Sequence, residues 1–298
     1  MRAVFVSRFG GPDVLEVRDL PPPEAGDGEL LVDVEAAGVN YRDVYERAGS
    51  YGGEPPFIAG VEGAGRVRET GALVAWTDVK GSYAEQIAVP AERAVAVPDG
   101  VSAELAAAAL LQGMTAHYLA TSTYAVREGD DVLVHAAAGG VGLLLTQIVK
   151  LRGGRVVATT SSDAKAELAR AAGADEVIGY DDIPERAFAV VYDGVGRATF
   201  AQSLAALRPR GMLVLYGAAS GSVAPFDPME LERGGSLYLT RPTLRHYATP
   251  ERARDVFDLI AAGKLDVRIG GRYPLAEARR AHEDLESRRT TGKLLLLP

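Results

Sequence analysis

The first hundred residues contain short apolar segments that are separated by turns. The segments Ala3–Val6, Leu30–Ala36 and Ala84–Val89 are rich in apolar and β-branched residues, and runs of proline and glycine lie between them. Such segments are typical of strands. Residues 1–112 are therefore predicted to form a mostly β domain.

From about Gln112 the pattern changes to alternating strands and helices. Apolar runs predict strands at 132–135, 155–159, 176–178, 188–192, 212–216 and 236–240, and helical spacing predicts helices at 141–151, 163–172 and 198–207. Strands that alternate with helices form βαβ units around a parallel sheet. Residues 113–262 are therefore expected to form a doubly wound α/β domain.

The C-terminal part carries two more helices and an apolar tail. Thr249 is a typical N-cap, Pro250 suits the first turn, and Gly263 follows the last periodic residue of the first helix. A second helix is expected around 275–287. The tail Leu294–Leu297 is typical of a strand that needs a sheet, so we expect residues 263–298 to return to the first domain, which is then discontinuous.

A glycine-rich turn gives the sharpest chemical signal. The predicted strand at 132–135 leads into Ala137-x-Gly139-x-x-Gly142 and then into a helix, which is the context of a dinucleotide fingerprint. Small residues let the backbone approach a pyrophosphate, and amides at the helix N-terminus hold its charge. The alternative is a tight strand-to-helix turn without a ligand.

The end of the next strand indicates which dinucleotide is bound. An NAD site usually has Asp or Glu there for the ribose hydroxyls, whereas this chain has Thr160, Ser161 and Ser162 with Lys165 close behind. Hydroxyls and an ammonium group suit a 2′-phosphate. Asp163 could still bind a ribose, and Lys165 could be a solvated residue, but the pattern favours NADPH over NADH.

Composition excludes several classes of function. The chain of 298 residues has 40 acidic and 32 basic residues, a net charge of −8, which argues against a broad nucleic-acid or anionic-membrane surface. It has no cysteine, so disulfides, thiolate metal sites and thiol nucleophiles are impossible. Neither a signal peptide nor an apolar run of about 18 residues is evident, so a cytoplasmic protein without membrane partners is expected.

Taken together, these motifs resemble the medium-chain dehydrogenase/reductase superfamily, and within it the zinc-free, zeta-crystallin-like quinone oxidoreductase branch. The resemblance spans nearly the whole chain, and it implies a GroES-like, mostly β catalytic domain and a Rossmann NADPH-binding domain. The segments that carry it are GVNYRDVYERAG at 38–49, GVEGAG at 60–65, QGMTAHY at 112–118, HAAAGGVG at 135–142, VVYDGVG at 190–196, LYLTRPTL at 237–244 and ESRRTTGKLLLLP at 286–298.

Zinc ligands of the wider superfamily are missing. Gly60-Val61-Glu62 stands where zinc-dependent relatives have Gly-His-Glu, no cysteine is present, and the four histidines have no ligand spacing. Alcohol dehydrogenation, which needs a Lewis acid, is therefore not expected. The resemblance instead implies hydride transfer to a quinone or another conjugated carbonyl, which needs little activation.

The resemblance also assigns catalytic roles. Asn40 matches the position near the nicotinamide, Tyr45 flanks it, and Tyr51 faces the acceptor and donates a hydrogen bond to the oxygen where charge develops. Packing beside a proline-rich loop is the alternative role for both tyrosines. Asp43, Glu62 and Asp193 are expected to be structural carboxylates.

Further coenzyme contacts are implied along the second domain and near the C-terminus. Gly139 and Gly142 belong to the fingerprint, and Ser161, Ser162 and Lys165 to the 2′-phosphate group. The other positions are Thr115, Gly140, Val141, Tyr180, Gly217, Ser220, Leu239, Thr240, Arg241 and Arg288.

Two connections are shorter than in the family. The passage between Gly65 and Tyr83 is trimmed, and the crossover helix between Tyr180 and Phe188 is missing. Seven residues with their flanking bonds span about 26 Å when extended, and the crossing needs about 22 Å. We therefore expect an extended connection without a full helix.

The leading hypothesis is an NADPH-dependent quinone reductase that dimerises through the edge strand around Leu237–Thr240. One alternative is an enal, enone or enoyl-thioester reductase that uses the same site. Another is a protein that binds NADPH without turning it over.

Overall fold

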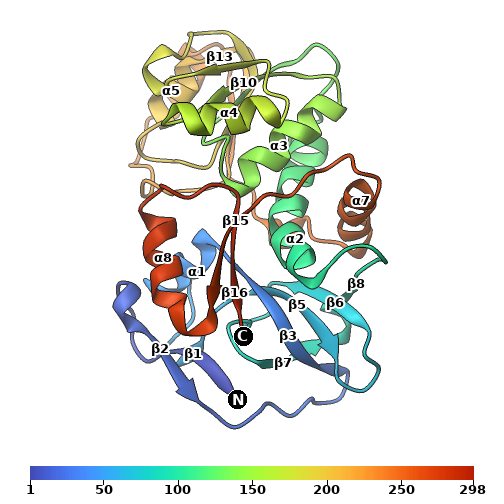
Figure 1. Cartoon of the computed structure of the whole chain (residues 1–298). Helices are drawn as coiled ribbons and strands as arrows, with labels where there is room; N and C mark the ends of the chain where they lie inside the picture. The colour runs from blue at the N-terminus through green and yellow to red at the C-terminus, as the bar shows by residue number, and fades with distance from the viewer. The chain divides into compact units, whose positions relative to one another are not determined.

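Three β-sheets organise the computed structural model, which describes residues 1–298. The chain divides into two units: the first comprises Met1–Leu111 and Thr249–Pro298, and the second comprises Gln112–Ala248 (Figure 1). The first unit is thus discontinuous. The segment 249–262, which the sequence placed in the second domain, groups with the first unit instead.

The first unit contains two of the sheets. One has three strands in the order β2-β1-β4, and the other has the order β15-β16-β3-β5-β6-β8, with β7 also paired to β3. The bounds are β1 (Arg2–Val6), β2 (Leu15–Asp19), β3 (Glu29–Val39), β4 (Phe57–Ile58), β5 (Glu62–Val67), β6 (Leu73–Thr77), β7 (Gln86–Pro90), β8 (Val95–Ala96), β15 (Ile269–Pro274) and β16 (Lys293–Leu297).

The C-terminal strand lies inside the larger sheet. β16 pairs in parallel with β15 and antiparallel with β3, where Leu294 faces Val39 and Leu296 faces Ala37. Leu295 and Leu296 are completely buried. The apolar tail is therefore a strand of the larger sheet of the first unit.

Four helices belong wholly or partly to this unit. They are α1 (Tyr41–Arg47), α2 (Ala103–Tyr118), α7 (Pro250–Ala261) and α8 (Ala278–Glu286), and α8 packs beside α1 (Figure 1). Thr249 caps α7 as predicted, because its hydroxyl accepts the Arg252 amide at 3.2 Å. The pattern of apolar and polar residues did not predict α2, although alanine, which is frequent in it, has a high helix propensity.

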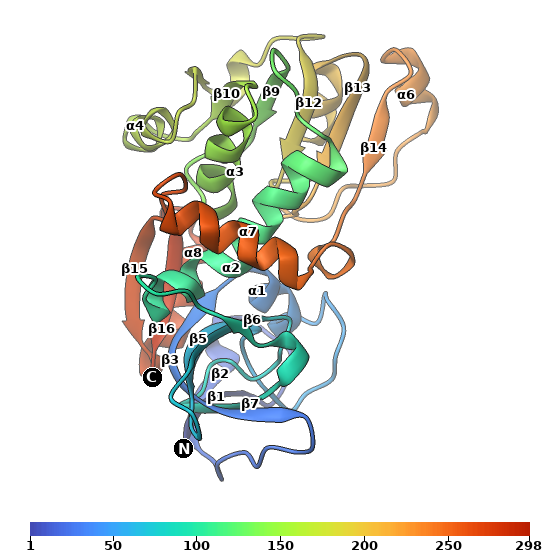
Figure 2. The same ribbon diagram turned by 90° about the vertical axis from the view of Figure 1, so that its right-hand side faces the viewer.

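The second unit is built on a parallel sheet of six strands in the order β11-β10-β9-β12-β13-β14. This 3-2-1-4-5-6 order is that of the doubly wound dinucleotide-binding fold, as expected. Figure 2 shows β14 at one edge, beside β13. The strands are β9 (Asp131–Val134), β10 (Arg155–Thr159), β11 (Glu176–Ile178), β12 (Phe188–Asp193), β13 (Leu207–Leu215) and β14 (Tyr238–Thr240).

Helices connect these strands, and their apolar faces cover the sheet. α3 contacts β9 and β10, α4 contacts β10 and β11, and α5 contacts β12 and β13. The bounds are α3 (Gly140–Leu151), α4 (Asp163–Ala171), α5 (Phe200–Ala205) and α6 (Met229–Arg233). None of the helices in the chain combines the length and apolar character that a membrane crossing requires.

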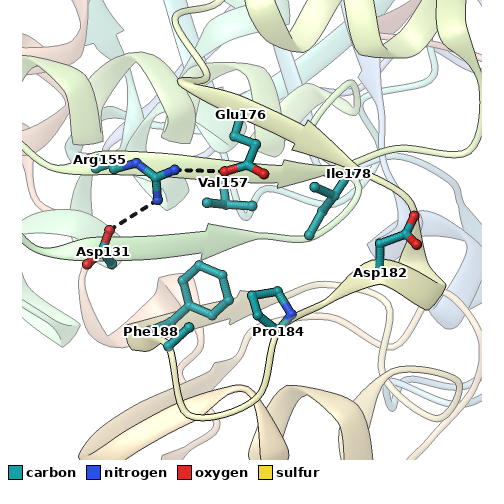
Figure 3. A pocket seen from close by; sticks show the side chains of 9 residues that line it. Asp131, Arg155, Val157, Glu176, Ile178, Asp182, Pro184 and Phe188 are labelled. Atoms are coloured by element: carbon teal, nitrogen blue, oxygen red, sulfur yellow. Dashed lines mark hydrogen bonds and ion pairs between the residues drawn. The ribbon is translucent and has the colours of Figure 1, made fainter.

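The connection from β11 to β12 has no α-helix, as predicted. It is not fully extended, however, because a 3₁₀ turn occupies Tyr180–Asp182. A pocket of about 350 Å³ opens where this connection passes, with Phe188 and Pro184 on one side and Val157 and Ile178 on the other (Figure 3). At its rim Arg155 pairs with Asp131 at 3.2 Å and with Glu176 at 2.7 Å (Figure 3).

Candidate functional site

The turn between β9 and α3 has the geometry that a pyrophosphate requires. Gly139 is the N-cap of α3, and Ala136 adopts a positive φ of 50° that is uncommon for a residue with a side chain. A Cβ on Gly142 would lie 2.5 Å from the Ala136 carbonyl oxygen and 2.7 Å from the Ala137 Cα. Gly142 therefore lets the strand and the helix pack closely, while the first amides of the 12-residue helix remain available for an anion.

Tyr180 is tied to this turn. Its hydroxyl accepts a hydrogen bond from the Ala136 amide at 3.2 Å, and its ring stacks on His135 with centroids 5.6 Å apart. His135 is completely buried between the hydroxyls of Thr159 and Ser203, and burial lowers its pKa, which favours the neutral ring. Tyr180 thus lies beside the fingerprint turn, and its contact with the adenosine part of the coenzyme stays a prediction.

The loop after β10 brings the expected 2′-phosphate residues together. Lys165 donates from Nζ to the Ser161 hydroxyl at 3.2 Å, and Ser162 is the N-cap of α4. Both serines are exposed, and partial burial lowers the pKa of Lys165. The ammonium group of Lys165 on the first turn of α4 and the hydroxyl of Ser161 in the preceding loop therefore lie together after the carboxyl end of β10.

The remaining predicted residues of the second unit lie on α2, α3 and β14 and in the loops after β13 and β14. Thr115 is buried on α2, close to Gln112, whose side chain fills the space that a Cβ on Gly140 would need. The Arg241 guanidinium donates to the Leu215 carbonyl at 3.0 Å. The half-buried residues of this group are Gly140 and Val141 on α3, Gly217 and Ser220 after β13, and Leu239 and Thr240 on β14.

Ser220 has a local structural function. Its hydroxyl donates to the Val195 carbonyl at 2.7 Å and accepts the Ala198 amide at 3.0 Å. Glycine at position 217 also has a structural explanation, because a Cβ there would collide with the backbone of Gly194. These contacts shape the ends of β12 and β13, and the assignment of both residues to the coenzyme stays a prediction.

In the first unit, Asn40 is embedded in a polar cluster. It is the N-cap of α1, it is 5% exposed, and its backbone amide donates to Asp43 at 2.8 Å. Its side-chain oxygen accepts a hydrogen bond from Lys293, and its side-chain nitrogen donates to Glu62 and to the Gly38 carbonyl. Asn40 therefore makes these hydrogen bonds within its own unit.

Asp43 begins a second buried chain of hydrogen bonds. Tyr83 donates its hydroxyl to Asp43 at 2.7 Å and lies 3.3 Å from His282 Nε2, while Arg47 donates to His282 Nδ1 at 3.2 Å. Burial raises the pKa of Asp43 to about 7. Burial, together with the Arg47 charge, lowers the pKa of His282 to about 3. Asp43 is thus a structural carboxylate, but one that titrates near neutral pH.

The two predicted tyrosines have different surroundings. Tyr51 is 41% exposed, and the Arg42 guanidinium lies 4.9 Å from the centre of its ring. Tyr45 is half-buried on α1, and its ring lies 6.1 Å from that of Tyr41. The exposed Arg288 interacts with the Tyr41 hydroxyl. All these residues belong to the first unit.

Sequence reasoning missed the partners of Asn40 and Tyr51. Lys293 was quoted only as part of a motif, yet a single lysine at the start of a buried apolar strand must find a counter-charge. That pattern could have identified Lys293. Arg42 carried no such signal, because its position over Tyr51 depends on the fold of the loop that follows α1.

The site contains no obvious metal centre and fits a dinucleotide. No group of three or more His, Asp or Glu residues is arranged to hold a metal ion. Gly139 and Gly142 lie at the start of α3, whose first amides suit a pyrophosphate, and Ser161 and Lys165 suit a 2′-phosphate. The residues present therefore fit NADPH.

Comparisons with known proteins agree with this geometry. Residues 26–99 match the family "Alcohol dehydrogenase GroES-like domain", and residues 172–296 match the family "Zinc-binding dehydrogenase". A quinone oxidoreductase of Pseudomonas aeruginosa is 43% identical over 100% of this chain and 99% of its own length. That alignment spans 323 positions, more than the 298 residues of this chain, as expected for shortened connections.

Solved structures give the same result. A mycobacterial protein complexed with NADPH is 47% identical, with a TM-score of 0.95 and full coverage of both chains. The Escherichia coli quinone oxidoreductase complexed with NADPH is 36% identical, with the same TM-score and coverage. The fold, the glycine turn and the full-length identity lead to one conclusion: this chain belongs to the quinone oxidoreductase branch of the medium-chain dehydrogenase/reductase superfamily.

Proposed function

We propose that this chain is an NADPH-dependent quinone reductase. The observation that carries the proposal is the pairing of Lys165 on α4 with Ser161 in the loop after β10, in a fold whose glycine fingerprint leads into the N-terminus of α3. The names of the full-length relatives support the choice of a quinone as acceptor.

The second unit holds the coenzyme in this proposal. Amides at the start of α3 bind the pyrophosphate, Lys165 and Ser161 bind the 2′-phosphate, and Tyr180 lies against the adenosine. When bound, NADPH supplies the hydride equivalent that reduces the acceptor. The protein contributes binding and orientation.

The first unit provides the acceptor-facing groups. Tyr51 is the candidate donor to the acceptor oxygen, because its ring is exposed and the Arg42 guanidinium holds it from one side. Tyr45 provides an aromatic surface on α1. A quinone needs only such a flat, apolar surface and one or two neutral donors.

The test is steady-state reduction of benzoquinones and naphthoquinones by the purified chain, with NADPH and NADH compared in parallel. We expect turnover with quinones and a preference for NADPH. The control replaces quinones with alkenals under the same conditions. Activity on alkenals alone would contradict the choice of acceptor, and NADPH binding without any turnover would contradict an enzymatic function.

The proposal includes a homodimer formed through β14. This strand lies at the edge of the parallel sheet, and Tyr238 on it is 57% exposed. An edge strand with unpaired backbone groups is suited to pairing with its copy around a twofold axis. Light scattering during gel filtration measures the mass, and a monomer at micromolar concentration would contradict this part.

We also propose a cytoplasmic location, because the proposed coenzyme is kept reduced inside cells. Fractionation of cells that express a tagged chain tests this, and recovery in an extracytoplasmic fraction would contradict it.

A further inference from the structure

A chain of hydrogen-bonded polar side chains joins three strand ends inside the second unit. Its four members are completely buried: His135 directly after β9, Thr159 at the end of β10, Asp193 at the end of β12 and Ser203 on α5. Because β9, β10 and β12 are parallel, their carboxyl ends meet at one edge of the sheet, from which the loops of a dinucleotide site leave. The chain therefore lies at the base of the proposed coenzyme site.

Asp193 is the final acceptor of this chain. Its carboxylate accepts two backbone amides and two hydroxyls, from Val195 at 2.7 Å, Gly196 at 2.9 Å, Thr199 at 2.7 Å and Ser203 at 2.8 Å. Four donors fill the roughly four lone-pair sites of a carboxylate. The single hydroxyl proton of Ser203 is therefore used by Asp193.

This direction fixes the tautomer of His135. Its Nε2 lies 3.0 Å from Ser203 Oγ, and since Ser203 has no second proton, Nε2 must carry the hydrogen and donate it. Burial lowers the pKa of His135, so the ring is neutral and Nδ1 holds a lone pair. Nδ1 then accepts the Thr159 hydroxyl at 2.9 Å. The hydrogen bonds thus run in one direction, from Thr159 to Asp193.

Thr159 ties the expected 2′-phosphate loop to the glycine turn. It is the last residue of β10, and Ser161 lies two residues further on. Its hydroxyl donates to His135, and its backbone carbonyl accepts the Ala137 amide of the glycine turn at 3.1 Å. The two loops are therefore joined at their base by one side-chain and one backbone hydrogen bond.

His135 also supports Tyr180. The two rings stack with an interplanar angle of 13°, and the amide of the next residue, Ala136, donates to the Tyr180 hydroxyl. Since His135 has no exposed surface, it acts on a bound nucleotide only through such neighbours.

We propose that His135 is a positioning residue, which holds the glycine turn and the 2′-phosphate loop at the separation that NADPH requires. NADPH must reach both the first amides of α3 and the pair of Ser161 and Lys165. NADH has no 2′-phosphate, so its binding does not depend on that separation. This inference rests on the proposed function and names a residue that sets the coenzyme selectivity of the same site.

The first experiment determines the tautomer of His135 in the coenzyme-free protein. The chain has four histidines, so ¹⁵N-histidine labelling and a long-range ¹H–¹⁵N NMR spectrum resolve each ring. The signal that disappears in a His135→Phe variant belongs to His135. We expect a neutral ring with its hydrogen on Nε2 at neutral pH. A hydrogen on Nδ1, or a charged ring, would overturn the inference whether or not the protein binds NADPH.

The second experiment removes the link between the two loops. In the double variant His135→Phe/Thr159→Val an aromatic ring stays beside Tyr180, and both partners of one hydrogen bond become apolar, so the fold should survive. Urea unfolding followed by circular dichroism verifies this. We expect NADPH affinity to fall roughly three- to tenfold in a fluorescence titration without quinone, and NADH affinity to stay within about twofold.

The matched control is Tyr192→Phe on the same sheet. Tyr192 is completely buried, and its hydroxyl donates to the Leu119 carbonyl at 3.0 Å, at residues that carry none of the proposed coenzyme contacts. This variant also loses a buried hydrogen bond, so it reproduces the destabilisation. Its ratio of NADPH affinity to NADH affinity should equal that of the wild type.

The outcomes separate this inference from the proposed function. Wild-type NADPH affinity in the folded double variant, equal losses for both nucleotides, or the same change of ratio in Tyr192→Phe would each overturn the inference alone. A wild-type chain that binds neither nucleotide would overturn the proposed function, on which the tautomer of His135 does not depend.

Discussion

At the scale of single residues, the site depends on a few positions where space or charge is tightly constrained. Gly142 lies against the backbone of its own turn, and Asp43 and His282 are titratable groups buried in one hydrogen-bonded chain. The sequence pointed to Gly142 through the fingerprint and to Asn40 and Tyr51 through resemblance. It did not indicate their partners, because Lys293 and Arg42 reach them only after distant segments have folded together.

We predict that Gly142→Ala lowers the free energy of unfolding by about 1–3 kcal/mol, because its Cβ would overlap backbone atoms that cannot move independently. The matched control is Gly139→Ala in the same turn, where the Cβ would lie 3.2 Å from the Ala136 carbonyl oxygen and φ is −76°. Urea unfolding followed by circular dichroism measures both. Equal stabilities would refute the packing argument.

Asp43 and His282 should give opposite pH dependences of stability. The pKa of Asp43 is raised from 3.8 to about 7, so the folded state binds the extra proton and stability falls as pH rises through that window. The pKa of His282 is lowered from 6.5 to about 3, so stability falls as pH drops through that window. Glu46 and Lys293 also act on Asp43, and Arg47 acts on His282.

Single variants should separate the two effects. His282→Gln leaves the Asp43 dependence, so its stability should decline between pH 4 and 7 by up to roughly 1.4 kcal/mol per unit, relative to the double variant Asp43→Asn/His282→Gln. Asp43→Asn should instead lose stability below about pH 6.5 relative to the same double variant. Denaturant midpoints across this range measure both, and parallel profiles in all three proteins would contradict the assignment.

At the scale of secondary-structure elements, the sequence predicted element boundaries best where particular residues mark the beginning or end of a helix or strand. The strand β10 and the helix α7 begin and end close to the predicted residues, because buried apolar runs and the Thr249 cap mark them. The helix α2 was missed because a run of alanines has high helix propensity but no periodic contrast between apolar and polar positions. The 3₁₀ turn at 180–182 was also missed, because the relatives have a longer crossover in this place and give no guide to the shortened one.

The loop after β10 should decide between the two pyridine nucleotides. Replacing Lys165 with alanine removes the ammonium group beside Ser161, and we expect NADPH affinity to fall about tenfold while NADH affinity stays the same, since one charge-assisted hydrogen bond is lost. Fluorescence titration with each nucleotide measures this. Lys150→Ala is the control, and an equal loss for both nucleotides would point to a structural effect of Lys165 instead.

At the scale of the whole molecule, the chain uses its two ends to build one unit and its middle to build the other. The strand order of the parallel sheet and the return of the tail were predictable, because both follow from buried strands that need neighbours. The assignment of the segment 249–262 to the first unit was not predictable. Helix caps locate the ends of a helix but do not indicate which sheet the helix packs on.

We predict that removing residues 293–298 unfolds the first unit and spares the second. The deletion separates β15 from β3 and takes away three buried leucines, together with the partner of Glu62. The fluorescence of the buried Trp76 should report the unfolding of the first unit, while a chain that lacks only Pro298 should keep the native emission spectrum. An unchanged emission spectrum after the longer deletion would count against a central role for β16.

The position of β16 also bears on how the protein is made. A ribosome releases β3 long before it reaches Lys293, and at about 5–20 residues per second the gap of some 250 residues lasts roughly 10–50 seconds. During that time the parallel sheet can be completed, whereas β3 exposes an unpaired edge on the nascent chain. Newly synthesised protein should therefore depend on chaperones mainly for its earliest residues, and arrested chains of increasing length would reveal when that dependence ends.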